Sequence, residues 1–593
     1  MKINKHFTFL FLKYTSGLKG MDFRLCGMVF RWLLIICSLR LAACSPPPAG
    51  IGKTVFHYNE PDGIATLDPA FSKNRSIIWP VHQIFNTLVE TDSNLYIVPS
   101  LARSWDISPD RRIWTFHLRT DVFFQDNAAF PEGRGRKMTA DDVVFSFNRI
   151  VDKQVASSGA WIFHDKIAGP QSGVAAGKPD KTDSAFSTDI PAGLDPPAFR
   201  ALDDSTFQLT LIRPFNPILG LLSMQYCAVV PREVVALYGK EFRNHPCGTG
   251  PFRFKSWDEG QDLILLKNEH YFEKDSLGRQ LPYLDAVKVS FFDNRATEFL
   301  LFRQGQLDFI NEIDASFKDE VLNKRGALKQ QWQGKIHLST HPQLNTEYLG
   351  ILIDTASDLV RHSPLRWRQV RQAINYGFDR RKMMLYLRNS IGIAAESGFV
   401  PAGLPSFDSS IVKGYHYDPV LARKLLAEAG YPDGRGIPVI RLLTVANYAD
   451  FASYIARQLK ELGIPVQVEV VQKSLLLEQT ARSQALFFRG SWMADYPDAE
   501  NYLSVFYSKN PAPPNYTRYN NPVFDRLYEQ ALLENDDSKR MELYRRMDQL
   551  VIDDAPIVPI WYDEAIRLVN PSVEGLTPNA LNLLELRRVH ILK

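Results

Sequence analysis

Hydrophobic positions repeat along this chain with two different periods. In residues 113–119 and 466–470 every second side chain is apolar, which predicts half-buried strands. Residues 139–150, 418–430 and 451–462 instead carry apolar side chains three and four positions apart, the spacing of one helix face. Strand-like and helix-like segments alternate throughout the chain, and this alternation predicts an α/β fold.

Two of the predicted helices begin at residues that can cap them. Thr139 and Asp142 have the spacing of a capping box. Asp418, with a proline next to it, is typical of a helix N-terminus, and Gly430 is typical of the end of that helix. Residues 153–200 are rich in Gly, Ala, Ser, Asp and Pro and predict a loop or an insertion.

The length of the chain predicts more than one domain. With 593 residues it exceeds the size at which a single hydrophobic core stops growing, so we expect two or three domains. The formal net charge is only +3, and no long cluster of lysine and arginine stands out. This balance argues against a nucleic-acid-binding protein.

The first residues carry the pattern of an export signal. Arg31 precedes a short apolar run, and the residues that end at Cys44 read LAAC, which resembles the cleavage motif of bacterial lipoproteins. We therefore predict a lipoprotein signal peptide over 1–43, a lipidated Cys44 and a proline-rich tether over 44–51. An ordinary signal peptide, in which Cys44 stands by chance, is the alternative. The chain offers three candidate start residues: Met1, Met21 and Met28.

The signal also predicts where the mature chain works. No other window of the sequence is long and apolar enough to span a bilayer. We expect an extracytoplasmic protein, in the periplasm or on the cell surface, anchored to the membrane through Cys44. In such an oxidising compartment Cys227 and Cys247 are a candidate disulfide, and two buried free thiols are the alternative.

Motifs for catalysis and metal binding are missing from the sequence. It contains no HExxH, GxSxG, P-loop or CxxC pattern, and its histidines do not fall at spacings typical of metal ligands. Residues 248–252, GTGPF, lack the further glycine and the helix start of a dinucleotide site, and predict a tight turn into a strand. We therefore predict a binding protein rather than an enzyme, with no metal site and no cofactor.

Residues 491–500, SWMADYPDAE, gather aromatic rings and carboxylates behind the apolar run 485–488. Such a stretch fits an acid catalyst, a metal site, a recognition site or a capped turn. No neighbouring histidine, cysteine or second placed carboxylate supports catalysis or metal binding. Recognition and a capped turn are therefore the favoured interpretations.

Several stretches of the chain resemble the family 5 extracellular solute-binding proteins, the oligopeptide- and dipeptide-binding components of ABC importers. They occur in the order typical of that family and span nearly all of the mature chain. Each alone has moderate specificity, and together they are very specific. The matching stretches are 101–126, 138–143, 245–252, 368–374, 418–432 and 492–498.

The resemblance implies a fold and its domains. The fold is α/β and of the periplasmic-binding-protein type (type II, in the large three-subdomain form), with two lobes and the ligand cleft between them. Lobe I is expected over 52–335, with a subdomain at about 73–199 inside it. Lobe II is expected over 336–562, and residues 563–593 return to lobe I.

The resemblance also implies how a peptide is bound. A free peptide carries an ammonium and a carboxylate, and an enclosed site has to neutralise both. In the peptide-binding relatives the aspartate of an Ala-Asp step holds the amino group, and here that residue is Asp495. An arginine six residues earlier can meet the carboxylate, and here it is Arg489. The alternatives are a turn cap for Asp495 and an ion pair, at the surface or between lobes, for Arg489.

Two segments are expected to bind the peptide backbone as an added strand. Ordinary core packing is the alternative for the first segment and for the tryptophan of the second. The lobe I segment consists of Gly63, Ile64, Ala65 and Thr66, and the lobe II segment of Gly490, Ser491, Trp492 and Met493.

From these features we predict a monomer that captures oligopeptides or dipeptides outside the cytoplasmic membrane. It would deliver them to the permease and ATPase subunits of an ABC importer, with no nucleic-acid partner. Another solute on the same fold, such as a nickel complex, haem, a sugar or a murein peptide, is the alternative. An exported hydrolase is a further, less favoured alternative.

Overall fold

The computed structural model describes residues 54–167 and 197–592. The predicted signal peptide, tether and lipidated Cys44 lie outside these residues. The described residues form one compact unit, and the bounds expected for lobe I and lobe II stay a prediction. Within the described part of the chain, none of the helices has the length and apolar character needed to cross a bilayer.

A mixed sheet forms the centre of this unit. Among the described residues it has eleven strands, and parallel and antiparallel pairs both occur. Its order is β15 (Val466–Val470), β14 (Ile440–Thr444), β16 (Phe487–Met493), β12 (His337–Ile351), β17 (Ile557–Val569), β11 (Phe309–Asn311), β1 (Val55–Asn59), β10 (Ala286–Ser290), β9 (Asp262–Lys267) and β8 (Phe252–Asp258), with β13 (Ile393–Ala394) beside β17.

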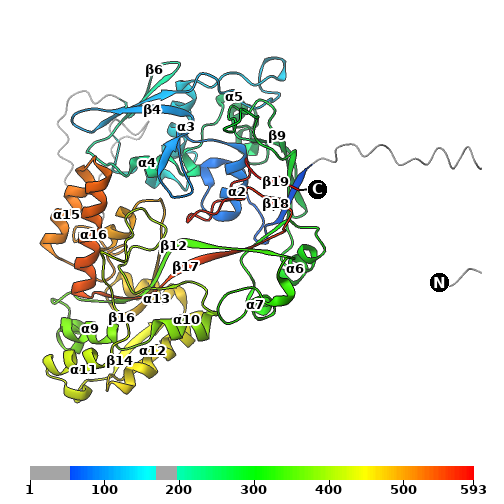
Figure 1. Ribbon diagram of the computed structural model, residues 1–593. Coiled ribbons are helices and arrows are strands. Elements are labelled where there is room, and N and C mark those ends of the chain that lie inside the picture. The colour runs from blue at the N-terminus through cyan, green and yellow to red at the C-terminus, as the bar shows by residue number, and fades with distance from the viewer. Residues whose placement is uncertain (1–53, 168–196, 593) are drawn as a thin grey trace, which may run out of the picture. The chain divides into compact units, whose positions relative to one another are not determined.

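Two long strands join the two ends of this sheet. β12 has 15 residues and β17 has 13, and they pair antiparallel from His337 and Val569 to Gly350 and Ile557. β16 adds to one side of this pair and β11 to the other. Figure 1 shows β12 and β17 side by side through the centre, with α2 and α5 to one side and α9 to α12 to the other.

Smaller sheets and helices surround the central sheet. A four-stranded sheet has the order β4 (Ala102–Ile107), β5 (Ile113–Leu118), β7 (Thr206–Thr210) and β6 (Phe199–Asp203). Two further antiparallel pairs are β2 (Val89–Thr91) with β3 (Ile97–Pro99) and β18 (Val573–Glu574) with β19 (His590–Ile591). The helices are α2 (Arg75–Ile84), α3 (Ala140–Val151), α4 (Ile218–Leu222), α5 (Arg232–Tyr238), α6 (Arg295–Arg303), α7 (Ala315–Val321), α8 (Asp358–Arg361), α9 (Arg368–Tyr376), α10 (Arg380–Arg388), α11 (Pro419–Glu428), α12 (Ala449–Glu461), α13 (Lys473–Ala481), α14 (Glu500–Leu503), α15 (Pro522–Leu533) and α16 (Asp537–Asp554).

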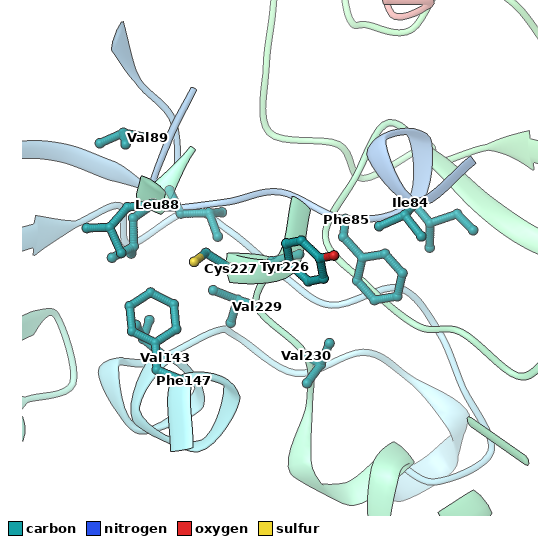
Figure 2. Packing of buried hydrophobic residues seen from close by; sticks show 14 of the residues in the cluster. Ile84, Phe85, Leu88, Val89, Val143, Phe147, Tyr226, Cys227, Val229 and Val230 are labelled. Carbon is teal, nitrogen blue, oxygen red and sulfur yellow. The ribbon is translucent and has the colours of Figure 1, made fainter. Parts of the chain in front are cut away.

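The hydrophobic core is divided into several clusters. The largest gathers α2, α3 and the four-stranded sheet, and Figure 2 shows Phe85, Phe147 and Val229 packed within it. A second cluster surrounds Phe399 and helices α15 and α16, and a third lies between α9 to α12 and the central sheet. Tyr496 belongs to the largest cluster although its neighbours in sequence belong to the second.

The strands and helices predicted from hydrophobic period are confirmed. Residues 113–118 and 466–470 form β5 and β15, so that the first strand ends one residue earlier than predicted. α3 begins after Thr139, which forms the expected capping box with Asp142. α12 (Ala449–Glu461) contains residues 451–461, and it begins two residues earlier and ends one residue earlier than the pattern indicated. The expected α/β fold class is therefore confirmed.

The cap of α11 gives a first testable prediction. The Asp418 carboxylate accepts hydrogen bonds from the backbone N–H groups of Val420 and Leu421, at 3.1 and 2.9 Å. Asp418→Ala leaves both donors without this acceptor, so we expect the free energy of unfolding to fall by about 1 kcal/mol. Urea unfolding measures the change. Glu428→Ala, at the other end of the same helix, is the control and should have a smaller effect.

The candidate disulfide between Cys227 and Cys247 is wrong. Both residues are buried free thiols. The thiol of Cys227 points to the backbone oxygen of Leu221 at 3.5 Å, and that of Cys247 to the backbone oxygen of Gln125 at 3.2 Å. Each sulfur therefore has its own carbonyl partner, and burial raises the pKa of both thiols. Figure 2 shows Cys227 among apolar side chains.

Alkylation of the protein tests this correction. When the purified protein is unfolded without reductant, we expect iodoacetamide to modify both Cys227 and Cys247, because neither is oxidised. Peptide mass mapping identifies the modified residues. In the folded protein both thiols should react slowly, because they are buried and protonated. Protection of both cysteines in the unfolded, unreduced protein would contradict the structure.

Candidate functional site

The segment at the end of β16 changes from buried to exposed along its length. Phe487 and Phe488 are buried, whereas Ser491 and Met493 are exposed. β16 pairs antiparallel with β12, so that Trp492 lies opposite Thr346. The alternation of a strand therefore presents every second side chain of the predicted lobe II segment to solvent.

Trp492 is held by both apolar packing and a hydrogen bond. It is half-buried and packs against the cluster around Phe399. Its indole Nε1 donates to Oδ1 of Asn501 at 2.9 Å. This arrangement favours core packing for Trp492, and its contact with a ligand stays a prediction.

Asp495 is an exposed carboxylate next to Asn501. Nδ2 of Asn501 donates to Oδ2 of Asp495 at 3.4 Å, and the backbone N–H of Asp495 donates to Oδ1 of Asn501 at 3.3 Å. Within residues 54–167 and 197–592, no lysine, arginine or histidine forms an ion pair with Asp495. Although the side chain meets solvent, the protein around it displaces water and raises the pKa of the carboxyl above its usual value.

The turn that carries Asp495 also contacts the N-terminal half of the chain. The ring of Tyr496 stacks on Trp161 with centroids 6.5 Å apart. Burial raises the pKa of Tyr226, and the charge of Asp495 raises it further, so these two groups lie within electrostatic reach. Asp495 therefore stands where segments from both halves of the sequence meet.

A pocket of about 260 Å³ lies beside this turn. Across it, Nδ2 of Asn216 donates to Oδ1 of Asn535 at 3.0 Å. Neither Asp495 nor Arg489 lines the pocket, so it is distinct from the predicted ligand site. The polar and aromatic residues that line it include Trp105, Trp114, Asn216, Asp498, Asp537 and Arg540.

Arg489 forms a buried ion pair that the sequence did not reveal. Its Nε donates to Oε2 of Glu347 at 3.1 Å, and its Nη2 donates to both carboxylate oxygens at 2.8 and 2.7 Å. The guanidinium lies over the ring of Tyr448, 3.9 Å from its centroid. The pair joins neighbouring strands of one sheet and is largely buried, so it is not a surface pair.

The one signal for Glu347 in the sequence is that it is the single acidic residue of the stretch that forms β12. From His341 to the end of β12 every residue is buried except Pro342 and Gln343, which are half-buried. A charged residue in such a strand requires a partner, because an unpaired buried charge is costly. The sequence cannot tell which of the many arginines supplies it.

The lobe I segment expected from 63–66 is not a strand. β1 ends at Asn59, and Gly63 has φ of +63°, in the left-handed region that suits glycine. The hydroxyl of Thr66 accepts from the backbone N–H of Asp68 at 3.0 Å. β1 stands four places from β16 in the sheet, and no hydrogen bond of the described residues joins the two segments. Peptide binding by 63–66 stays a prediction.

Comparison with known proteins identifies the family. Residues 96–514 match the model of the bacterial extracellular solute-binding proteins, family 5. The chain belongs to this family. It is the solute-binding component of an ABC importer, a periplasmic or extracellular protein and not an enzyme. Among the described residues, no group of three or more His, Cys, Asp or Glu residues could hold a metal ion.

Relatives that are named for different ligands are about equally similar to this chain. It is 28% identical to heme-binding protein A of Haemophilus influenzae, over 83% of this chain and 84% of that protein. It is 26% identical to the periplasmic oligopeptide-binding protein OppA of Escherichia coli, over 91% of this chain and 93% of that protein.

Solved structures confirm the fold. The unliganded open form of the murein tripeptide-binding protein MppA has a TM-score of 0.75 and 23% identity, over 91% of this chain and 98% of that one. The binding protein DppA of Helicobacter pylori, in complex with the peptide STSA, has a TM-score of 0.64 and 25% identity with the same coverage.

Proposed function

We propose that this protein captures peptides outside the cytoplasmic membrane and delivers them to the permease of an ABC importer. The observation that carries the proposal is Asp495, a carboxylate with raised pKa that no cation of the described chain neutralises. Such a group is suited to a ligand ammonium, which is the one charge that every free peptide carries at its first residue.

The position of Asp495 supports its coupling to closure of the protein. Asp495 lies on a turn whose next residue, Tyr496, is buried in the cluster of the N-terminal half. A ligand that contacts both halves stabilises the closed state by its difference in affinity for the open and closed states. Peptide binding at Asp495 would therefore favour closure, which the importer can recognise.

The proposal extends to the membrane anchor. Cys44 would carry the lipid and residues 44–51 would tether the binding domain to the membrane. Among the relatives, the names of the Escherichia coli and Bacillus subtilis proteins specify oligopeptides and dipeptides, whereas the Haemophilus influenzae protein is named for haem. These names are consistent with a peptide ligand, but they do not distinguish a peptide from haem as the ligand of this chain.

Native mass spectrometry of the purified protein tests the proposed function. We expect masses of a heterogeneous set of peptides to be released from the protein on activation. Release of haem, of a metal complex or of a single non-peptide solute would contradict the proposal. Repetition after unfolding and refolding, with a defined set of alanine peptides added back, shows whether binding is reversible and separates ligand from contaminant.

A further inference from the structure

The place expected for a ligand carboxylate is already filled by a carboxylate of this chain. The carboxylate of Glu347 accepts bidentate hydrogen bonds from the guanidinium of Arg489, at 2.7 to 3.1 Å. Its Oε1 also accepts from the hydroxyl of Tyr448 at 3.2 Å and from Nδ2 of Asn345 at 3.3 Å. Arg489, Tyr448 and Asn345 therefore form a complete carboxylate-binding site, and its occupant is Glu347.

Exchange of Glu347 for a ligand carboxylate is unfavourable. Only 3% of the Glu347 side chain and 13% of the Arg489 side chain are exposed. A ligand that took Arg489 away would leave Glu347 buried without its cation, and such a charge is strongly destabilising. Burial already raises the pKa of Glu347 although Arg489 opposes the shift, which shows how strongly the surroundings disfavour a lone carboxylate there.

The neighbouring charges do not supply a substitute for Arg489. Asp563 lies beside this site, where Nδ2 of Asn345 hydrogen-bonds to it. It pairs with Nη2 of Arg388 at 2.9 Å and accepts from the indole of Trp561 at 2.7 Å. Glu347 with Arg489 and Asp563 with Arg388 therefore make two neutral pairs. Asp495 is the carboxylate of this region that has no cationic partner in the described chain.

We propose that Glu347 is a specificity-determining residue that occupies Arg489 and makes ligand binding independent of a free terminal carboxylate. The inference rests on the proposed function and specifies its substrate class. The ligands would be peptides that are recognised by their N-terminal ammonium and whose carboxyl end can be free, amidated or extended. A peptide of this class needs one charged contact, at Asp495, instead of two.

Matched peptides test this inference on the unchanged protein. Alanine di-, tri-, tetra- and pentapeptides are each prepared as the free acid and as the C-terminal amide, and calorimetry gives the dissociation constant of each. For every length that binds, we expect acid and amide to differ by no more than about threefold, because Arg489 is already occupied by Glu347. An acid preference of about thirtyfold or more in the unchanged protein would overturn the inference.

Removing the charge of Glu347 should create the preference that the unchanged protein lacks. Glu347→Gln keeps the shape of the side chain and frees the charge of Arg489, so we expect the free acid to bind about tenfold or more tightly than the amide. The double variant Glu347→Gln with Arg489→Gln should return the ratio to the value of the unchanged protein. The control is Glu396→Gln, since Glu396 accepts hydrogen bonds from Arg381 in a more exposed pair, and it should leave the ratio unchanged.

The outcomes separate this inference from the proposed function. If acids and amides both bind, and Glu347→Gln folds without altering their ratio, the role of Glu347 is refuted while peptide binding stands. If no peptide binds, the proposed function is refuted, and the inference with it. If Glu347→Gln does not fold, the ratio in the unchanged protein decides the question alone.

Discussion

Replacement of Asp495 by asparagine is expected to weaken peptide binding by about 2–5 kcal/mol, which is roughly a 30- to 4,000-fold increase in the dissociation constant. The reason is that the peptide ammonium, enclosed between the two halves of the protein, would lose its only carboxylate partner. Asparagine keeps an acceptor for Asn501, so the turn should keep its shape. Calorimetry with a free-amine peptide measures the effect.

Two controls accompany this variant. Asp450→Asn removes an exposed charge at the start of α12 and should leave peptide affinity unchanged. The thermal midpoint of the unliganded Asp495→Asn variant should match that of the unchanged protein within a few degrees, because Asp495 has few contacts. Unchanged peptide affinity in the Asp495→Asn variant would remove Asp495 from the site.

The pH dependence of binding follows from the same residue. The surrounding protein displaces water from the carboxyl and holds the pKa of Asp495 above its usual value, so it takes up a proton at a higher pH than an ordinary aspartate does. We expect peptide affinity to fall as the pH is lowered through that range, because a neutral carboxyl does not pair with an ammonium. The Asp495→Asn variant should lack this dependence.

Replacement of Asp548 is expected to change how the stability of the whole fold depends on pH. Asp548 lies on α16, is 4% exposed, and accepts hydrogen bonds from the backbone N–H groups of Phe399 at 2.7 Å and Val400 at 3.3 Å. Gly398 lies directly against the carboxyl, where a Cβ atom would come within 1.8 Å of Oδ2. Burial, which the two N–H donors offset only in part, raises the pKa of Asp548 to about 7.

The direction of the effect follows from proton uptake. An unfolded chain has an aspartate pKa of about 4. Between about pH 4 and pH 7 the folded protein therefore holds a proton on Asp548 that the unfolded chain has lost, so stability falls as the pH rises through this window. Compared with Asp548→Asn, we expect the free energy of unfolding of the unchanged protein to decrease by about 3 kcal/mol more between pH 5 and pH 8.

Urea unfolding of both proteins at several pH values measures this difference. Asp553→Asn, an exposed site on the same helix, is the control and should leave the pH dependence as it is in the unchanged protein. Equal pH dependence in the unchanged protein and the Asp548→Asn variant would show that Asp548 ionises at an ordinary pKa. It would then have to be reached by water or by a cation.

Local signals in the sequence predicted much of the secondary structure. The cap of α11 is written in adjacent residues, Asp418 and its following proline, and the structure has the helix at Pro419–Glu428. The alternation in 113–119 reflects one buried and one solvated face, and β5 follows it. Such features depend on neighbours in sequence, so they can be recognised without the fold.

Pairings between distant residues could not be predicted in the same way. Glu347 and Arg489 are 142 positions apart and meet only because β12 and β16 pair in one register. Cys227 and Cys247 are closer in sequence, but each thiol points to a different backbone carbonyl. The partner of a buried group is fixed by strand register and helix packing, which the pattern of apolar positions does not specify.

The central claim is that a ligand ammonium binds at Asp495, and one measurement tests it most directly. A peptide that binds the unchanged protein is compared by calorimetry with the same peptide acetylated at its N-terminus. We predict that acetylation weakens binding by about 30-fold or more, because it removes the charge that Asp495 pairs with. Equal affinity for the free and acetylated peptides would contradict the claim.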